Sequence, residues 1–258
     1  MTKVANITNF LLEKYPLNLA SSFDQGKVGL QFGSTSTNVK KVMIALDGST
    51  EVVKDALTKH VDLLITHHPF MFNSLLNLNY DNPLTERIKL VIKNELNVFA
   101  MHTNFDVAIN GMNEILCARL GLQDIKSDQS EIDSNAFLRY GYIEPISLHD
   151  LSKLGQERFG EPKIRIVGDD SKIIKKVGIV GGGGSFELYK AALHNCDAFI
   201  TGEIKHNNAL DALDLGIALI EVSHSVERLF KEHVREMLVK EFPDVEFVFS
   251  DKDVNPFH

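Results

Sequence analysis

The sequence predicts an α/β protein built from duplicated βα repeats with parallel or mixed sheets. Apolar runs of about four to six residues alternate with amphipathic stretches of about ten, over residues 41–122 and again over residues 177–242. This alternation is typical of βαβ units. Shifting residues 42–66 by 135 positions also pairs seven identical residues among 25. We interpret this match as an internal duplication, with chance similarity between two βαβ units as the alternative.

Three strands and three helices are expected in each half. In the first half the strand-like runs are KVMIAL (41–46), VDLLIT (61–66) and VFAMH (98–102), and the helix-like runs cover 51–60, 84–96 and 111–122. In the second half the strand-like runs are VGIV (177–180), DAFIT (197–201) and ALIEV (218–222), and the helix-like runs cover 185–195, 207–216 and 225–242.

The region between the halves has a different character. It opens with the polar segment IKSDQSEIDSN at residues 125–135, which we expect to be an exposed linker. Strand-like FLRYGYI and KIRIVG follow, on either side of helix-like SLHDLSKLGQERF. We therefore expect a first α/β repeat at 1–125, a connector with a β-rich element at 126–176 and a second repeat at 177–258.

The composition excludes several classes of protein. In the 258 residues, 44% are hydrophobic and 24% are charged, as in globular domains. The formal charge of −8 argues against a nonspecific nucleic-acid binder, because such proteins carry clustered Lys and Arg. Two cysteines, Cys117 and Cys196, cannot form a disulfide scaffold or a Cys-based zinc knuckle. No signal peptide or run of eighteen apolar residues is present, so we expect a cytoplasmic protein without membrane contact.

Imidazoles and carboxylates follow the expected strands at three places, where ligands gather in open α/β sheets. They are His67 and His68 after VDLLI, His102 and Asp106 after NVFA, and His224 and Glu227 after IALIE.

The histidine doublet requires a break in its strand. Adjacent side chains of a regular strand point to opposite faces, so His67 and His68 can converge only where the strand ends. Pro69, which has no N–H to donate, favours such a break. His224 and Glu227 would share one face of a helix that starts there.

Imidazole and carboxylate without thiolate form a ligand set for Zn, Mn, Fe, Co or Ni, and a bridging carboxylate could hold two ions together. A lone histidine at a strand end is more often a surface or hydrogen-bonded residue than a ligand. His102 could instead orient a metal ligand through a hydrogen bond without binding the metal itself. The coincidence of three such motifs at strand exits favours the metal interpretation.

Two further features leave alternatives open. The glycine run Gly181–Gly184 lacks the dinucleotide pattern, because Phe186 occupies the place of the third glycine, and it is either a tight packing turn or an anion site. Glu203 and His206 are candidates for proton transfer or substrate contact. Alternatively, Glu203 is only a carboxylate at a helix start.

The ordered motifs LITHHPF, HTNFD followed by GMNE, GGGGS, ITGEIKH and SHSVER resemble the NIF-three-like dinuclear-metal-centre family, also called GTP cyclohydrolase 1 type 2 homologues. The resemblance runs from about residue 10 to the end and includes KVGLQFG and NPF. It implies an intertwined, duplicated α/β fold and a toroidal homohexamer.

The resemblance also implies the ligands of two divalent ions per chain. His68 and Asp106 would hold one ion, and His67 and His224 the other, with Glu227 bridging. Two residues separate His224 from Glu227, which is the shorter of the family's spacings, and Ser223 stands where a glycine is common. Both departures put the bridge geometry in doubt.

The resemblance indicates the metals more firmly than the reaction. We expect a metal-dependent hydrolase that acts on a nucleotide or phosphoester, with the substrate itself open. The alternative is a non-catalytic metal carrier or regulatory protein, and a third possibility is a ring in which the metals only stiffen the fold.

Overall fold

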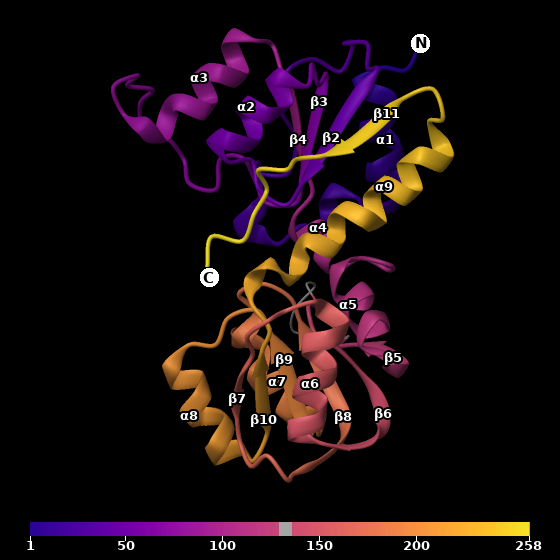
Figure 1. Ribbon diagram of the computed structural model, residues 1–258, viewed down its shortest axis with the longest axis vertical. Helices are drawn as coiled ribbons and strands as arrows, with labels where there is room; N and C mark the ends of the chain where they lie inside the picture. The colour runs from indigo at the N-terminus through magenta and orange to yellow at the C-terminus, as the bar shows by residue number, and fades with distance from the viewer. Residues whose placement is uncertain (129–135, 258) are drawn as a thin grey trace. The chain divides into compact units, whose positions relative to one another are not determined.

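The computed structural model describes residues 1–128 and 136–257, and the chain folds into two compact units (Figure 1). Unit 1 combines Met1–Phe105 with Arg228–His258, and unit 2 is Asp106–Glu227. These bounds differ from the three expected segments because the C-terminal segment pairs with the first sheet rather than the second. The expected linker lies mostly outside the described residues, at 129–135.

Unit 1 contains a five-stranded mixed sheet. Its order is β1 (Gly29–Phe32), β4 (Asn97–Ala100), β3 (Leu63–Thr66), β2 (Lys41–Ala45) and β11 (Glu246–Phe249). All neighbours are parallel except β1, which runs antiparallel to β4 at the edge. The helices are α1 (Val4–Lys14), α2 (Thr50–Thr58), α3 (Glu86–Lys93) and α9 (Leu229–Glu241), with short turns η1 (Leu17–Leu19), η2 (Ser22–Asp24) and η3 (Pro83–Thr85).

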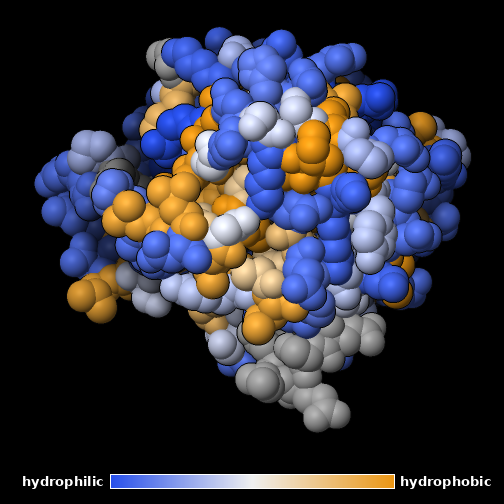
Figure 2. Space-filling view, turned by 90° about the horizontal axis from the view of Figure 1, so that it is seen from below, coloured by the Kyte–Doolittle hydropathy of each residue, from blue (hydrophilic) through white to orange (hydrophobic). Residues whose placement is uncertain are grey.

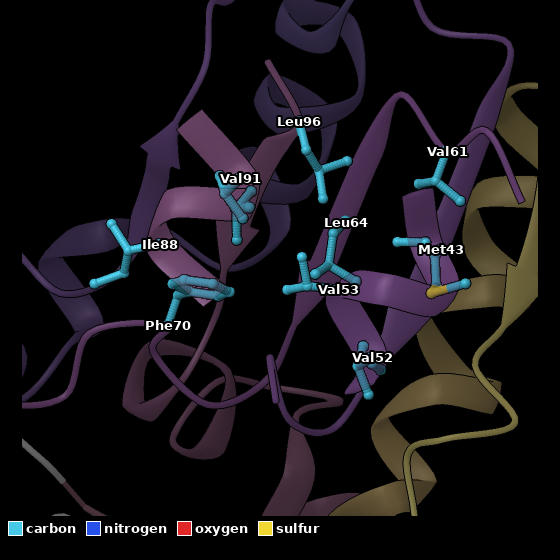
Figure 3. Close-up of a cluster of buried hydrophobic side chains, with 12 residues drawn as sticks. Met43, Val52, Val53, Val61, Leu64, Phe70, Ile88, Val91 and Leu96 are labelled. Atoms are coloured by element: carbon cyan, nitrogen blue, oxygen red, sulfur yellow. The ribbon is translucent and has the colours of Figure 1, made fainter. Parts of the chain in front are cut away.

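Helices cover the first sheet on both faces, so its central strands are apolar at nearly every position. Met43 of β2 and Leu64 of β3 pack against Val53 of α2 and Val91 of α3 (Figure 3). On the other face, α9 contacts β2 and β11. Packing on both faces fixes the parallel strands of this sheet. The candidate residues of unit 1 come directly after the carboxyl ends of these strands.

Unit 2 contains a six-stranded mixed sheet. Its order is β5 (Gln123–Ser127), β6 (Arg139–Ser147), β8 (Ile173–Val180), β9 (Ala198–Thr201), β10 (Ala218–Glu221) and β7 (Arg165–Val167). The centre β8–β9–β10 is parallel, and the connector supplies antiparallel strands on its two sides. The helices are α5 (Met112–Leu120), α6 (Leu148–Phe159), α7 (Leu188–Leu193) and α8 (His206–Leu215), with η4 (Gly184–Glu187). The segments α4 (Thr103–Asp106) and η5 (His224–Arg228) contain the two points where the chain passes between the units.

The two parallel centres repeat the same hydrogen bonds, as an internal duplication predicts. In unit 1, Asp62 Oδ2 accepts from the backbone N–H groups of residues 40–41, at 2.7 and 3.0 Å. In unit 2, Asp197 Oδ2 accepts from residues 175–176, at 2.8 and 2.9 Å. All three positions differ by the 135 residues of the sequence match. The same hydrogen-bond pattern therefore links the aspartate before β3 to the start of β2 in unit 1, and the aspartate before β9 to β8 in unit 2.

The strand registers agree as well. Val42 of β2 is opposite Leu63 of β3, and Val177 of β8 is opposite Ala198 of β9. Both pairs are again related by 135 positions. Within residues 1–128 and 136–257, no helix combines the length and apolar character needed to cross a bilayer.

Candidate metal site

His67 and His68 lie where β3 ends. The strand stops at Thr66, whose hydroxyl donates to the backbone carbonyl of His68 across 2.8 Å. Beyond that point the two imidazole rings lie with their centroids 5.1 Å apart. The end of the strand thus allows adjacent side chains to approach each other, as the doublet followed by proline predicts.

Each ring of the doublet is held through Nδ1. His67 Nδ1 lies 2.9 Å from the carbonyl oxygen of Met101, and His68 Nδ1 lies 2.8 Å from Asp47 Oδ1. A carbonyl and a carboxylate only accept hydrogen bonds, so Nδ1 carries the hydrogen in both rings. In the neutral imidazole the lone pair is then on Nε2, which is the form that binds a metal.

His102, between β4 and α4, shows the same arrangement. Its Nδ1 donates to Asp24 Oδ2 at 2.7 Å. Burial alone would raise the pKa of the Asp24 carboxyl, but hydrogen bonds from His102 and Thr103 hold this pKa below its ordinary value. The His102 ring lies 5.3 Å from that of His67 and 5.6 Å from that of His68 between centroids. One ligand atom from each histidine lies within 4.8 Å of the others.

In unit 2, His224 and Glu227 lie on one turn of η5. His224 Nε2 is 3.2 Å from Glu227 Oε2, so the spacing of three residues brings the two groups together as expected. His224 Nδ1 donates to Glu203 Oε1 at 2.7 Å. The preceding residue, Ser223, has a left-handed backbone with φ 78°, which turns the chain after β10. A glycine would adopt that conformation without strain.

Two glycines of the run in unit 2, Gly181 and Gly182, lie against the carboxylate of Glu227. A methyl group on Gly182 would lie 2.6 Å from Glu227 Oε1, and one on Gly181 would lie 2.9 Å from the same oxygen. Gly182 is also left-handed, with φ 52°. An anion on this loop would lie beside a carboxylate and be repelled by it. The contacts therefore favour the close-packing role of the run over an anion site.

Asp106 and Glu227 are both buried, with 8% and 4% of their surface exposed. Asp106 is the first residue of unit 2 and Glu227 is the last. Both connections between the units are therefore made at candidate ligands.

Glu203 and His206 have different surroundings. Glu203 holds His224, although its side chain is largely exposed. His206 is exposed at the first residue of α8, without a hydrogen bond to Glu203 in the described part of the chain. The roles of both residues in proton transfer stay predictions.

Two site residues were missed from the sequence, Asp47 and Asp24. Asp47 follows β2 directly after Leu46, so the strand-exit rule that selected the histidines would also have selected it. Asp24 lies in a region of short turns that carried no such signal.

The donor set fits a metal because the four histidines share one orientation. In His67, His68, His102 and His224, Nδ1 is bonded to an oxygen acceptor. Elsewhere the arrangement is reversed. His194 uses Nε2 toward Asp128, and His233 uses Nε2 toward the hydroxyl of Tyr15. Metal-bound histidines characteristically donate their other nitrogen to a carboxylate or carbonyl.

The chain is similar to a protein family, to curated proteins and to solved structures over nearly its whole length. The Duf34/NIF3 family (NGG1p interacting factor 3) matches residues 2–256. A GTP cyclohydrolase 1 type 2 homolog of Clostridium perfringens is 31% identical, over 99% of this chain and 98% of that protein. One from Ureaplasma parvum is 34% identical, over 92% and 90%. The crystal structure of Staphylococcus aureus hypothetical protein SA1388 has a TM-score of 0.90 at 28% identity, over 99% of this chain and 98% of that one.

Proposed function

The chain belongs to the Duf34/NIF3 family, and from this premise we propose that it holds two divalent metal ions. One ion would bind His68 and Asp106 and the other His67 and His224, with Glu227 bridging. Imidazole and carboxylate donors suit Zn, Fe, Mn, Co or Ni.

The observation that carries the proposal is the shared orientation of the histidines. A histidine in a hydrogen-bond network can use either nitrogen, yet His67, His68 and His224 all use Nδ1 toward an acceptor. In the neutral rings of His67 and His68 the lone pair is then on Nε2, whereas Nε2 of His224 lies 3.2 Å from Glu227 Oε2, on the carboxylate proposed to bridge the ions. Such preorganisation reduces the cost of arranging ligands when an ion binds.

The placement of the two acidic ligands adds support. Asp106 follows Phe105, the last residue of the first segment of unit 1, and Glu227 precedes Arg228, where unit 1 resumes. The backbone therefore ties each carboxylate of unit 2 directly to unit 1, which carries His67.

We further propose a hydrolase-type reaction on a nucleotide or phosphoester, in line with the cyclohydrolase-homolog name of the relatives. When bound, two divalent ions supply Lewis acidity that lowers the pKa of water and polarises a substrate atom. Glu203 would keep His224 in its ligand form. His206, exposed at the start of α8, would be available to contact substrate or move a proton.

Elemental analysis of untagged protein tests the metal part, with two equivalents per chain expected. For the reaction, metal-loaded protein should turn over a member of a nucleotide and phosphoester panel, and Glu227→Gln should abolish that turnover. Glu232→Gln, on an exposed position of α9, is the matched control. Absence of turnover across the panel, together with metal transfer to an apo-enzyme, would replace the hydrolase by a metal carrier.

A homohexamer is the assembly that we propose with this function. Large apolar side chains are exposed on unit 2, among them Leu193 of α7 at 81% and Leu213 of α8 at 56%. Apolar side chains also gather in patches on the face shown in Figure 2. Such patches mark interaction surfaces. Light scattering should give six times the mass of the chain, and a monomer at micromolar concentration would exclude this assembly.

A further inference from the structure

We infer that His102 is a third imidazole donor to the metal within unit 1, and that buried Asp24 positions it for that role. The inference deepens the proposed function and rests on it, because the family resemblance implies only His67 and His68 as ligands from this unit. It concerns Asp24 and His102 alone, and all the contacts that support it lie inside unit 1.

The hydrogen bonds around Asp24 fix the tautomer of His102. Asp24 is fully buried, and its Oδ2 lies 2.7 Å from His102 Nδ1, 2.6 Å from Thr103 Oγ1 and 3.2 Å from Thr103 N. Thr103 Oγ1 accepts from the backbone N–H of Ser21 at 2.9 Å, so its own hydrogen is directed to Asp24. The carboxylate is thus the acceptor in every contact, and His102 must donate from Nδ1.

The backbone of His102 is held as well. Its N–H donates to Asn104 Oδ1 at 3.0 Å, and Asn104 Nδ2 donates to the carbonyl of Tyr15 at 2.8 Å. With the backbone fixed and Nδ1 bonded to Asp24, rotation of the ring would break a hydrogen bond to a buried carboxylate. The direction of Nε2 is therefore determined by the fold.

Nε2 of His102 is the nitrogen left to act as a ligand. Ligand atoms of His67, His68 and His102 lie within 4.8 Å of one another. Two nitrogens bound to one ion at about 2.0–2.1 Å are at most about 4.2 Å apart. Closing the group onto an ion therefore requires movements of under about 1 Å, which side-chain rotation can supply.

The competing role for this pair is an ion pair, in which His102 is an imidazolium that neutralises buried Asp24. That form has hydrogen on both nitrogens and cannot bind a metal. NMR of ¹⁵N-histidine-labelled protein separates the two roles, with His102→Gln to assign the signals. In the metal-free protein we expect His102 as the Nδ1–H tautomer. On saturation with Zn²⁺, its Nε2 signal should leave the lone-pair region together with those of His67 and His68.

Zinc titration calorimetry supplies a second readout. Asp24→Ala should weaken Zn²⁺ binding about 10- to 100-fold, as the loss of an outer hydrogen-bond partner does, and His102→Gln should weaken it at least as much. His60→Gln, on an exposed residue of unit 1, is the control and should bind as the wild type. If Asp24→Ala fails to fold, Asp24→Asn and the wild-type spectra decide the question.

The results separate this inference from the proposed function. If the His67 and His68 signals move with Zn²⁺ while that of His102 does not, the third donor is refuted and the dinuclear site stands. If none of the signals moves and no zinc binds, the proposed function itself fails. An imidazolium spectrum for His102 in the zinc-loaded protein would also overturn the inference.

Discussion

Replacing Gly182 by alanine should displace the carboxylate of Glu227. Gly182 combines a left-handed backbone, φ 52°, with a Cβ position only 2.6 Å from Glu227 Oε1 and 3.1 Å from its carboxyl carbon. Ordinary contact begins at 3.4 Å, so either the loop or Glu227 must move by about 0.8 Å or more. If Glu227 moves, the substitution changes metal binding without touching a ligand.

The expected loss of folding free energy in Gly182→Ala has two parts. A left-handed non-glycine residue costs about 1–2 kcal/mol, and overpacking in a closed site adds about 1–3 kcal/mol. Gly216 is a matched control, because it has φ 69° and a methyl group there would meet nothing within 4 Å. Gly216→Ala should therefore show only the first part, and Gly182→Ala should show both.

Urea unfolding of both variants measures this difference in the free energy of unfolding. Zinc titration of the same samples then reports the position of Glu227, and we expect binding at least about tenfold weaker for Gly182→Ala than for Gly216→Ala. Equal stability losses with unchanged zinc affinity would show that the loop absorbs the methyl group. The glycine would then have no role in placing the carboxylate.

Three further outcomes follow from the structure. Burial lowers the pKa of His233, although the charge of Glu236 opposes this shift. In the unfolded chain His233 is protonated near pH 6.5, whereas in the folded chain it stays neutral to lower pH. The free energy of unfolding should therefore fall as the pH drops below about 6.5. Urea unfolding across pH 5–8 should show a shallower slope for His233→Gln, and an unchanged slope would refute the assignment. Asp62→Ala and Asp197→Ala should each lower the free energy of unfolding by about 1–3 kcal/mol. If only one of the two substitutions destabilises the protein, the two aspartates do not play equivalent roles in the two halves. Chelation should lower the melting temperature, because ligand at 1,000 times its Kd adds about 4 kcal/mol; a temperature unaffected by chelation would argue against metal in the native protein.

The strand ends were predictable because they depend on local pattern. Runs of apolar residues mark the buried strands, and polar residues directly after them mark the exits. His67, His68 and His224 were found in this way, and the structure places all three immediately or shortly beyond a strand. The spacing between His224 and Glu227 was informative for the same reason, since both belong to one turn.

The anchors of these residues were harder to predict, because hydrogen-bond partners distant in sequence are chosen by the tertiary fold. Asp24 is 78 residues from His102, and no periodicity links the two. The bounds of the units depend on long-range pairing too. β11 joins β2 across about 200 residues of chain, and a single sequence contains no signal for that choice of partner.

The duplication explains how one backbone framework serves two different sets of side chains. Position 68 corresponds to position 203, so His68 and Glu203 occupy equivalent strand exits. In unit 1 His68 is at this exit, and the carboxylate that holds it, Asp47, is in the loop after β2. In unit 2 the exit carries the anchor, Glu203, and the histidine that it holds is His224.

The loop residues complete this exchange. Position 47 corresponds to position 182, where a carboxylate in unit 1 is replaced by Gly182 in unit 2. The absence of a side chain at 182 is what allows Glu227 to approach the loop. A histidine introduced at position 203 would therefore lack the carboxylate that Asp47 provides to His68, and it would also remove the acceptor that holds His224. The two halves therefore carry different side chains at equivalent positions of the same framework, and each holds its histidine by a carboxylate from a different position.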